Sequence, residues 1–81
     1  MSDDFMQEAK TLVVEVLEGK VTPESHPAVF NDDLLYMRVR FLETEARDWL
    51  FAELKNDRYM PAYREEIIAC LSPDGVQLFA G

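Results

Sequence analysis

The sequence has few of the residues on which catalytic, metal and phosphate sites depend. It contains one cysteine, one histidine and three isolated glycines in 81 residues. A single cysteine excludes an internal disulfide and is typical of a reducing compartment. One histidine and one cysteine do not supply the four nitrogen or sulfur ligands of a zinc site, and isolated glycines do not make a phosphate loop. We therefore expect no metal and no cofactor.

His26 and Cys70 are the only histidine and the only cysteine of the chain. The sequence shows no second residue with which either of them would form a catalytic site. His26 follows Ser25 in a proline-flanked segment, and Cys70 falls on the apolar side of an expected helix. A free cysteine in that position behaves as a small buried hydrophobe. Because nucleophilic catalysis needs a nucleophile, a base and an orienting group, we expect a protein that is not an enzyme. A small enzyme or ligand carrier is the least favoured alternative.

Long apolar runs are also missing. The longest, residues 67–71, has five residues, whereas a membrane-spanning helix needs about 20. The N-terminus lacks the basic and apolar parts of a secretory signal. With 48% hydrophobic residues, the chain is expected to fold as a single cytoplasmic domain over residues 1–81, without a membrane partner.

Positive charge is scarce as well. Eight lysines and arginines stand against 16 acidic residues, giving a net charge of −8. The first 33 residues hold eight of the acidic residues and two of the basic ones. Such a charge opposes direct binding to nucleic acid or anionic lipid and favours basic partners.

The residues that are present predict a helix, a long connection and a strand in the first half of the chain. Apolar residues at helical spacing between Phe5 and Leu17 indicate a helix over residues 3–18, which Gly19 ends. The β-branched residues within 11–21 leave a strand or hairpin open as an alternative. Residues 19–33 have turn residues and no clear period, so we expect a connecting loop there.

The second half is expected to supply the sheet and two more helices. Leu35, Met37, Val39 and Phe41 alternate with polar residues, which is typical of a half-buried strand. Helices are expected over residues 44–56 and 61–71, and a short strand over 76–80. The sequence thus predicts a small α+β domain of order α-β-α-α-β, with a minimal two-stranded sheet packed against helices.

Three residues of the expected strand form the first candidate binding surface. Tyr36, Arg38 and Arg40 would lie together on the face that points away from the core. Tyrosine and arginine are enriched at the energetic centres of protein interfaces. This face is therefore expected to bind another protein, while the alternative is that the two arginines form minor ion pairs within the sheet.

The acidic side of the first helix is the second candidate surface. Asp4, Glu8, Glu15 and Glu18 fall in one row opposite the apolar stripe, where a solvated face is the ordinary interpretation. The sharper hypothesis is nucleic-acid mimicry. The rise of a helix separates Asp4 from Glu8 by about 6 Å and Glu8 from Glu15 by about 10.5 Å, which is near the spacing of phosphates.

Two apolar residues, Val14 and Phe51, fit no internal face of the expected helices. A helix with apolar residues on more than one side is usually buried on more than one side, so they predict self-association as a homodimer. Taken together, the sequence predicts a small acidic protein-binding module that acts as an inhibitor, regulator or assembly factor. Compact acidic proteins occur among the accessory proteins of phages and mobile elements, which is an analogy of size and charge only.

Overall fold

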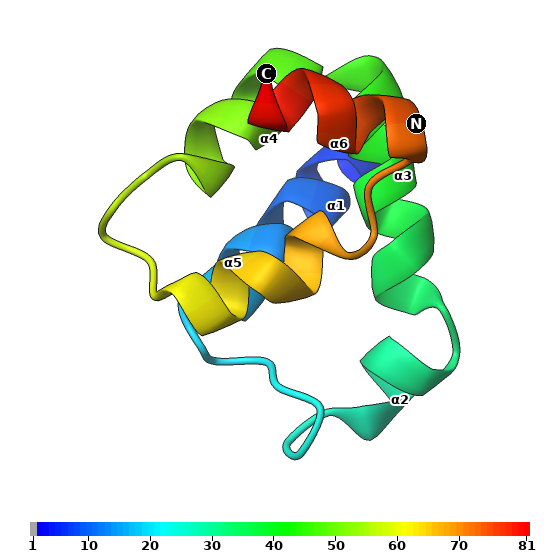
Figure 1. Cartoon of the computed structure of the whole chain (residues 1–81). Helices are drawn as coiled ribbons and strands as arrows, with labels where there is room; N and C mark the ends of the chain where they lie inside the picture. The colour runs from blue at the N-terminus through cyan, green and yellow to red at the C-terminus, as the bar shows by residue number, and fades with distance from the viewer. Residues whose placement is uncertain (1) are drawn as a thin grey trace.

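The chain folds as a set of helices without a sheet. The computed structural model describes the backbone of residues 2–81 and the side chains of residues 4–81. Within this range the helices are α1 (Ser2–Leu17), α2 (Pro27–Asn31), α3 (Leu34–Glu45), α4 (Arg47–Leu54), α5 (Pro61–Ile68) and α6 (Pro73–Ala80) (Figure 1). No strand is present in the described residues. The prediction of an α+β domain with a two-stranded sheet is therefore wrong.

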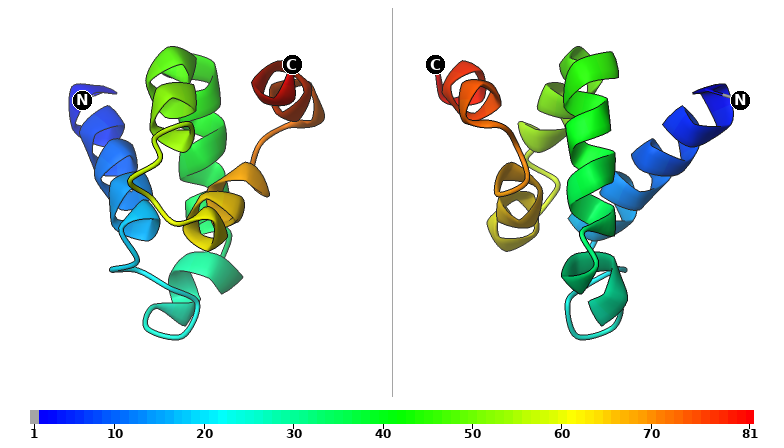
Figure 2. Two further views of the ribbon diagram at one scale, coloured as in Figure 1. Left: turned by 60° about the vertical axis from the view of Figure 1, so that its left-hand side comes forward. Right: turned by 90° about the vertical axis from the view of Figure 1, so that its right-hand side faces the viewer.

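The helix α3 stands at the centre of the arrangement. It packs against α1, α2, α4 and α5, and α5 also packs against α1 and α4. In both views of Figure 2, α1 and α6 lie on opposite sides of α3 and α4. The start of α1 and the end of α6 lie toward the end of the molecule that is away from α2.

The core is apolar and draws on four helices. α1 contributes Ala9, Val13, Val16 and Leu17, and α3 contributes Leu35, Val39 and Leu42. Leu50 and Leu54 of α4 and Ile67 of α5 complete the centre of the cluster, while Val21, Tyr59 and Leu71 from the connections close it. Burial of apolar surface of this kind is the main favourable term in folding.

The predicted first helix is confirmed, and the strand alternative for residues 11–21 is excluded because 11–17 are helical. Gly19 ends the helix with a φ of 78°. The Lys20 amide donates to the Glu15 carbonyl at 2.9 Å, and the Gly19 amide donates to the Val16 carbonyl at 3.0 Å. These two bonds form a Schellman motif, which needs a left-handed residue. A Cβ at Gly19 would also lie 2.7 Å from the Tyr63 ring. Both the positive φ and this close approach therefore favour glycine at position 19.

The connection over residues 19–33 contains a helix that the sequence pattern did not indicate. Pro27 opens α2, which is one and a half turns long and ends at Asn31. Proline suits the first turn of a helix because its missing amide would have no partner there. Val29 and Phe30 of α2 pack against the core, so part of this connection covers it.

Residues 35–41 form part of α3 instead of a strand. The alternating pattern requires Met37 to be buried, but 59% of its surface is exposed. The helical pattern instead buries Leu35, Val39 and Leu42, which are spaced by four and then three residues. Leu42, which lies beyond the end of the alternating pattern at Phe41, is fully buried.

Residues 76–80 form most of α6 and not a terminal strand. Ser72 is the N-cap, and its hydroxyl accepts a hydrogen bond from the Gly75 amide at 3.0 Å. Pro73 follows at the first helical position. The Ser72–Pro73 pair is thus a helix start, whereas the sequence pattern suggested a turn before a strand.

One carboxylate from α3 holds the start of α6. Glu43 Oε1 accepts from the Ser72 amide at 2.8 Å, and Glu43 Oε2 accepts from the Ser72 hydroxyl. The Glu43 side chain is 12% exposed, and a Cβ at Gly75 would collide with it. An anion at a helix N-terminus satisfies amides that lack partners within the helix.

We expect Glu43→Gln to loosen α6 while the rest of the fold persists. A hydrogen bond to a charged group contributes about 1.5–3 kcal/mol, so amide exchange over residues 76–80 should accelerate by about tenfold or more. Hydrogen exchange measured by NMR checks this, with the exposed Glu45→Gln on the same helix as the control. Equal exchange of α6 in the two variants would contradict the role of Glu43.

Candidate functional site

An open groove runs along one side of α1, and we call it the α1 groove. Its first part, the Trp49 hollow, has a volume of about 540 Å³ and is lined by Lys10, Val14, Glu15 and Trp49 among others. Its second part, the Tyr59 hollow, has a volume of about 350 Å³ and is lined by Leu17, Tyr59, Met60 and Tyr63 among others. Glu18 and Lys20 line both hollows, so the two parts adjoin at this ion pair.

The Trp49 hollow lies between α1 and the first turn of α4. Trp49 is half-buried, and its neighbour Leu50 anchors that turn in the core. Lys10 extends from α1 so that its Nζ lies 5.2 Å from the centroid of the Trp49 ring. A cation at this distance is attracted by the negative face of the ring.

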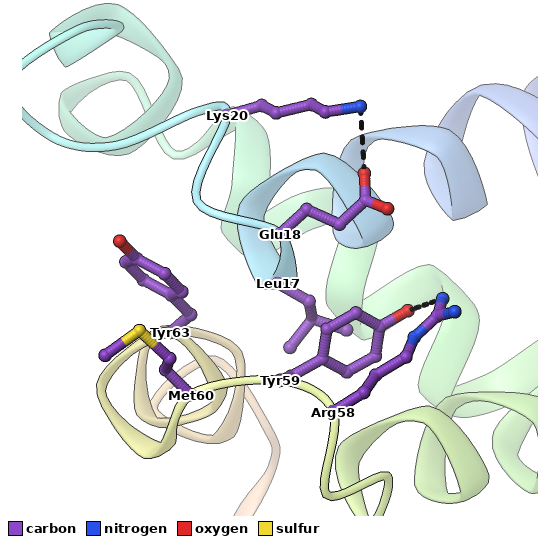
Figure 3. Close-up of a pocket in the computed structure, with 7 residues that line it drawn as sticks. All are labelled: Leu17, Glu18, Lys20, Arg58, Tyr59, Met60 and Tyr63. Atoms are coloured by element: carbon purple, nitrogen blue, oxygen red, sulfur yellow. Dashed lines mark hydrogen bonds and ion pairs between the residues drawn. The ribbon is translucent and has the colours of Figure 1, made fainter.

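The Tyr59 hollow lies between the end of α1 and the start of α5 (Figure 3). The buried Tyr59 accepts a hydrogen bond from Arg58 at 2.5 Å and donates one to Glu53 at 3.0 Å. The bond to the Tyr59 hydroxyl raises the pKa of Arg58. Met60 is 60% exposed, and Tyr63 lies over Gly19. This end of the groove therefore offers aromatic and thioether surface to a ligand.

The basic residues of the chain are mostly engaged by aromatic rings. Lys10, Arg38, Arg40, Lys55 and Arg58 each lie between 4.4 and 5.7 Å from a ring centroid. The ion pairs among the described side chains are Lys20 with Glu18 at 3.3 Å and Arg40 with Glu43 at 4.0 Å. Among the described side chains, Glu18 and Glu43 are therefore the acidic residues that have an ion-pair partner.

The predicted acidic row lies beside the α1 groove. Asp4, Glu8 and Glu15 line one shallow surface of α1, and Asp4 and Glu8 are exposed. Glu15 also lines the Trp49 hollow. Glu18 lies just past the end of α1, where it pairs with Lys20 inside the groove. The structure thus places Glu15 and Glu18 in the groove and Asp4 and Glu8 on the adjoining surface of α1.

The three residues of the predicted strand face do not share a face in the helix. Arg40 donates a hydrogen bond to the Tyr36 hydroxyl at 2.6 Å, so these two lie together. Arg38 lies on another side of α3, with its guanidinium carbon 4.4 Å from the centroid of the Phe5 ring of α1. The expected Tyr36–Arg38–Arg40 surface does not exist as one patch, because successive even-numbered residues of a helix diverge by about 200°.

The two apolar residues assigned to self-association have separate surroundings. Val14 lines the Trp49 hollow. Phe51 packs edge-to-face on Phe79 of α6, with the ring centroids 5.4 Å apart. Phe51 therefore has a partner within the chain. Self-association as a homodimer stays a prediction.

Ser25, His26 and Cys70 are the residues that could take part in nucleophilic catalysis, and they do not form a common site. The Ser25 hydroxyl and His26 Nδ1 are 2.8 Å apart in an exposed turn that Thr22 also stabilises. Cys70 is half-buried, and its thiol donates to the Glu66 carbonyl at 3.5 Å. Burial raises the pKa of the Cys70 thiol, with nearby carboxylates adding to the effect. This shift opposes the thiolate form, which is the reactive one.

We expect Cys70 in the folded chain to react slowly with iodoacetamide at neutral pH. Its raised pKa keeps the thiol protonated, and its half-buried position limits access. Mass spectrometry of the alkylated chain measures the rate, with the same chain in concentrated urea as the control. Alkylation as fast in buffer as in urea would show that Cys70 is an open, ordinary thiol.

The described residues hold neither a metal-binding cluster nor a membrane-spanning helix. No group of three or more histidine, cysteine, aspartate or glutamate side chains there is arranged to hold a metal ion. Among the same residues, no helix combines the length and the apolar character that crossing a membrane requires.

Most residues of the groove were not recognised from the sequence as site residues. Lys10, Trp49, Tyr59, Met60 and Tyr63 come from segments up to about fifty residues apart, and the chain must fold before they meet. The one available signal was Val14, an apolar residue outside the stripe of its helix. Comparison with family models, curated proteins and solved structures gives no match to this chain.

Proposed function

We propose that the chain is a non-catalytic protein-binding module whose α1 groove docks on a basic segment of another protein. In this role it acts as an inhibitor, regulator or assembly factor of that protein. A cytoplasmic location accords with its single cysteine.

The observation that carries the proposal is the combination of an acidic edge and an aromatic floor in one groove. Glu15 and Glu18 border the groove, and Asp4, Glu8 and Glu15 line the adjoining surface of α1, which no lysine or arginine lines. A basic segment finds its negative charge on this adjoining surface, because Lys10, Lys20 and Arg58 line the two hollows themselves. Electrostatic complementarity of this kind accelerates encounter and selects the partner.

The apolar part of the groove supplies contact area for such a segment. Trp49, Tyr63 and the exposed Met60 offer large side chains at the surface. Aromatic residues and methionine are enriched at the centres of protein interfaces, where most of the binding energy resides. A partner segment with basic residues and an apolar one therefore fits the groove along its length.

Nucleic-acid mimicry by the acidic row is the second candidate function. Asp4, Glu8 and Glu15 share one surface of α1, and the rise of the helix separates successive members by about 6 and 10.5 Å. In that case the partner is a nucleic-acid-binding protein, and DNA competes with the chain for it.

Affinity capture with the immobilised chain tests the proposal. Wild-type chain and a variant with Glu8, Glu15 and Glu18 changed to glutamine are exposed to the same proteome at low and high salt. The proposal predicts basic partners that the wild type retains at low salt and the variant does not. Capture of the same proteins by both would contradict it. Displacement of the captured partner by double-stranded DNA would favour mimicry over general docking.

A further inference from the structure

The helix α6 has a wider apolar face than the chain covers. Gly75 is the buried residue of this helix, and Phe79 is half-buried against the Phe51 ring, with the centroids 5.4 Å apart. Leu78 and Val76 lie on either side of Phe79 around the helix, because successive residues turn by about 100°. They are 56% and 39% exposed. Two flanks of this face are therefore open to a further contact.

A hollow beside α6 brings the exposed leucine together with two opposite charges. We call it the α6 hollow. It has a volume of about 480 Å³ and is lined by Arg47 at the start of α4 and by Asp74, Gln77 and Leu78 of α6. All four residues are exposed. Arg47 and Asp74 belong to different helices, and neither forms an ion pair with a described side chain.

The charges of the α6 hollow are complementary to a second copy of the same surface. The lining carries one base and one acid in a chain of net charge −8, so it selects neither a basic nor an acidic partner. In a two-fold symmetric contact, a residue i of one copy meets a residue j of the other, and the reverse. A two-fold axis through the hollow therefore brings Arg47 of each copy to Asp74 of the other.

We propose that the chain forms a two-fold symmetric homodimer through the α6 hollow. The two Leu78 side chains pack together, and Arg47 of each copy pairs with Asp74 of the other. Leu78 supplies the apolar contact, and the two reciprocal ion pairs fix the orientation of the copies. Because the contact is limited to α6 and the start of α4, the dimer belongs to the weak class that buries less than about 1,200 Å².

The dimer leaves the α1 groove of each copy open. α1 and α6 lie on opposite sides of α3 and α4 (Figure 2), and the α6 hollow has no lining residue in common with the groove. A partner with two basic segments then binds both copies at once, which raises the overall affinity without any new contact. The inference goes beyond the proposed function and is independent of it, because self-association is measured on the chain alone.

Reversal of either charge tests the reciprocal ion pairs. Sedimentation equilibrium of the full chain at up to about 1 mM should show the wild type in equilibrium between monomer and dimer. Arg47→Glu and Asp74→Arg should each weaken self-association by at least about fourfold. The reason is that two attractions become two repulsions, and each exposed ion pair contributes a factor of about 1.4 to 5. Circular dichroism checks that each variant keeps its helices.

An equimolar mixture of the two variants separates contacts between copies from contacts within one chain. In a mixed dimer, the introduced glutamate meets the introduced arginine, and the native Asp74 meets the native Arg47. The mixture should therefore associate about as strongly as the wild type, although each variant alone does not. A role of Arg47 and Asp74 within their own chain gives no such recovery.

Glu24→Arg is the matched control for Asp74→Arg. Both substitutions raise the net charge by two, and Glu24 lies in an exposed turn outside the α6 hollow. Because a smaller net charge reduces the general repulsion between copies, the control should leave self-association unchanged or slightly stronger. Asp74→Arg should change it in the opposite direction.

Substitution of the apolar residue provides a second, independent test. Leu78→Gln should weaken the dimer by about tenfold or more, because the apolar contact is lost from both copies. Val14→Gln, in the α1 groove, should leave it unchanged. A wild-type chain that stays monomeric at about 1 mM would overturn the inference. So would a mixture of the charge variants without recovery, or a larger effect of Val14→Gln than of Leu78→Gln.

Discussion

Replacing Leu42 with alanine is expected to lower the free energy of unfolding by about 2–5 kcal/mol, the largest stability effect we predict. Leu42 is fully buried at the centre of the core, and truncating a buried leucine removes its apolar contacts and leaves a cavity. For a domain of this size, each kcal/mol lowers the melting temperature by about 4–8 °C. Urea unfolding followed by circular dichroism measures the change.

Met37→Ala is the matched control for Leu42→Ala. Met37 lies on the same helix but is 59% exposed, so its truncation should change the free energy of unfolding by no more than about 0.5 kcal/mol. A strand over residues 35–41 would instead bury Met37, so that its truncation would be costly, and would end before Leu42. A larger loss of stability in Met37→Ala than in Leu42→Ala would therefore contradict the helical fold.

Changing Glu8, Glu15 and Glu18 together to glutamine is expected to weaken binding of the basic partner by about three- to hundredfold. An exposed ion pair contributes about 0.2–1 kcal/mol, so the loss of three amounts to about 0.6–3 kcal/mol, and 1.4 kcal/mol is a factor of ten. Affinity should also depend less on salt in the variant, because fewer exposed charges remain to be screened. Calorimetry with the captured partner at two ionic strengths measures both effects.

A control variant with the same change in net charge tests whether binding depends on the charges beside the groove or on the net charge of the chain. Glu24, Glu45 and Glu65 are exposed and do not line the α1 groove, so their change to glutamine should weaken binding much less. Glutamine and glutamate have similar helix propensities, which leaves the helices intact in both variants. Equal weakening in the two variants would show that the partner senses total charge and not the groove.

The first helix could be predicted from the sequence because several independent signals agreed. Its apolar stripe is long, and Gly19 stands where the end of the helix needs a left-handed residue. A shorter helix has fewer such signals, so its sequence can also fit a strand. Leu35 and Val39 fit both a helix and a strand, so only Leu42 and the exposed Met37 distinguish the two. The alternation ended at Phe41, and the helical spacing continued beyond it.

The last helix was missed because its start resembles a turn. Ser72, Pro73, Asp74 and Gly75 are common turn residues, but serine followed by proline also begins helices. The carboxylate that stabilises this start comes from Glu43, 29 residues earlier in the chain. Such a contact cannot be inferred from local pattern, and it decides the structure of residues 73–80.

The candidate site could be predicted only in part, for a similar reason. The acidic row was visible because its residues lie on one helix, whose period places them on one side. The Tyr36–Arg38–Arg40 surface depended on a strand and was lost with it. The hollows required knowledge of how α1 packs near Trp49 and Tyr63, which depends on the tertiary fold.

Mapping the bound partner on the chain by NMR tests the central claim most directly. The amide shifts of the isotope-labelled chain would be followed while the basic segment of the captured partner is added. We predict that shift changes concentrate on residues 7–20, Trp49 and residues 58–63, which surround the α1 groove. Changes concentrated on Tyr36, Met37 and Arg40, with the groove residues unaffected, would contradict the claim that the α1 groove is the docking surface.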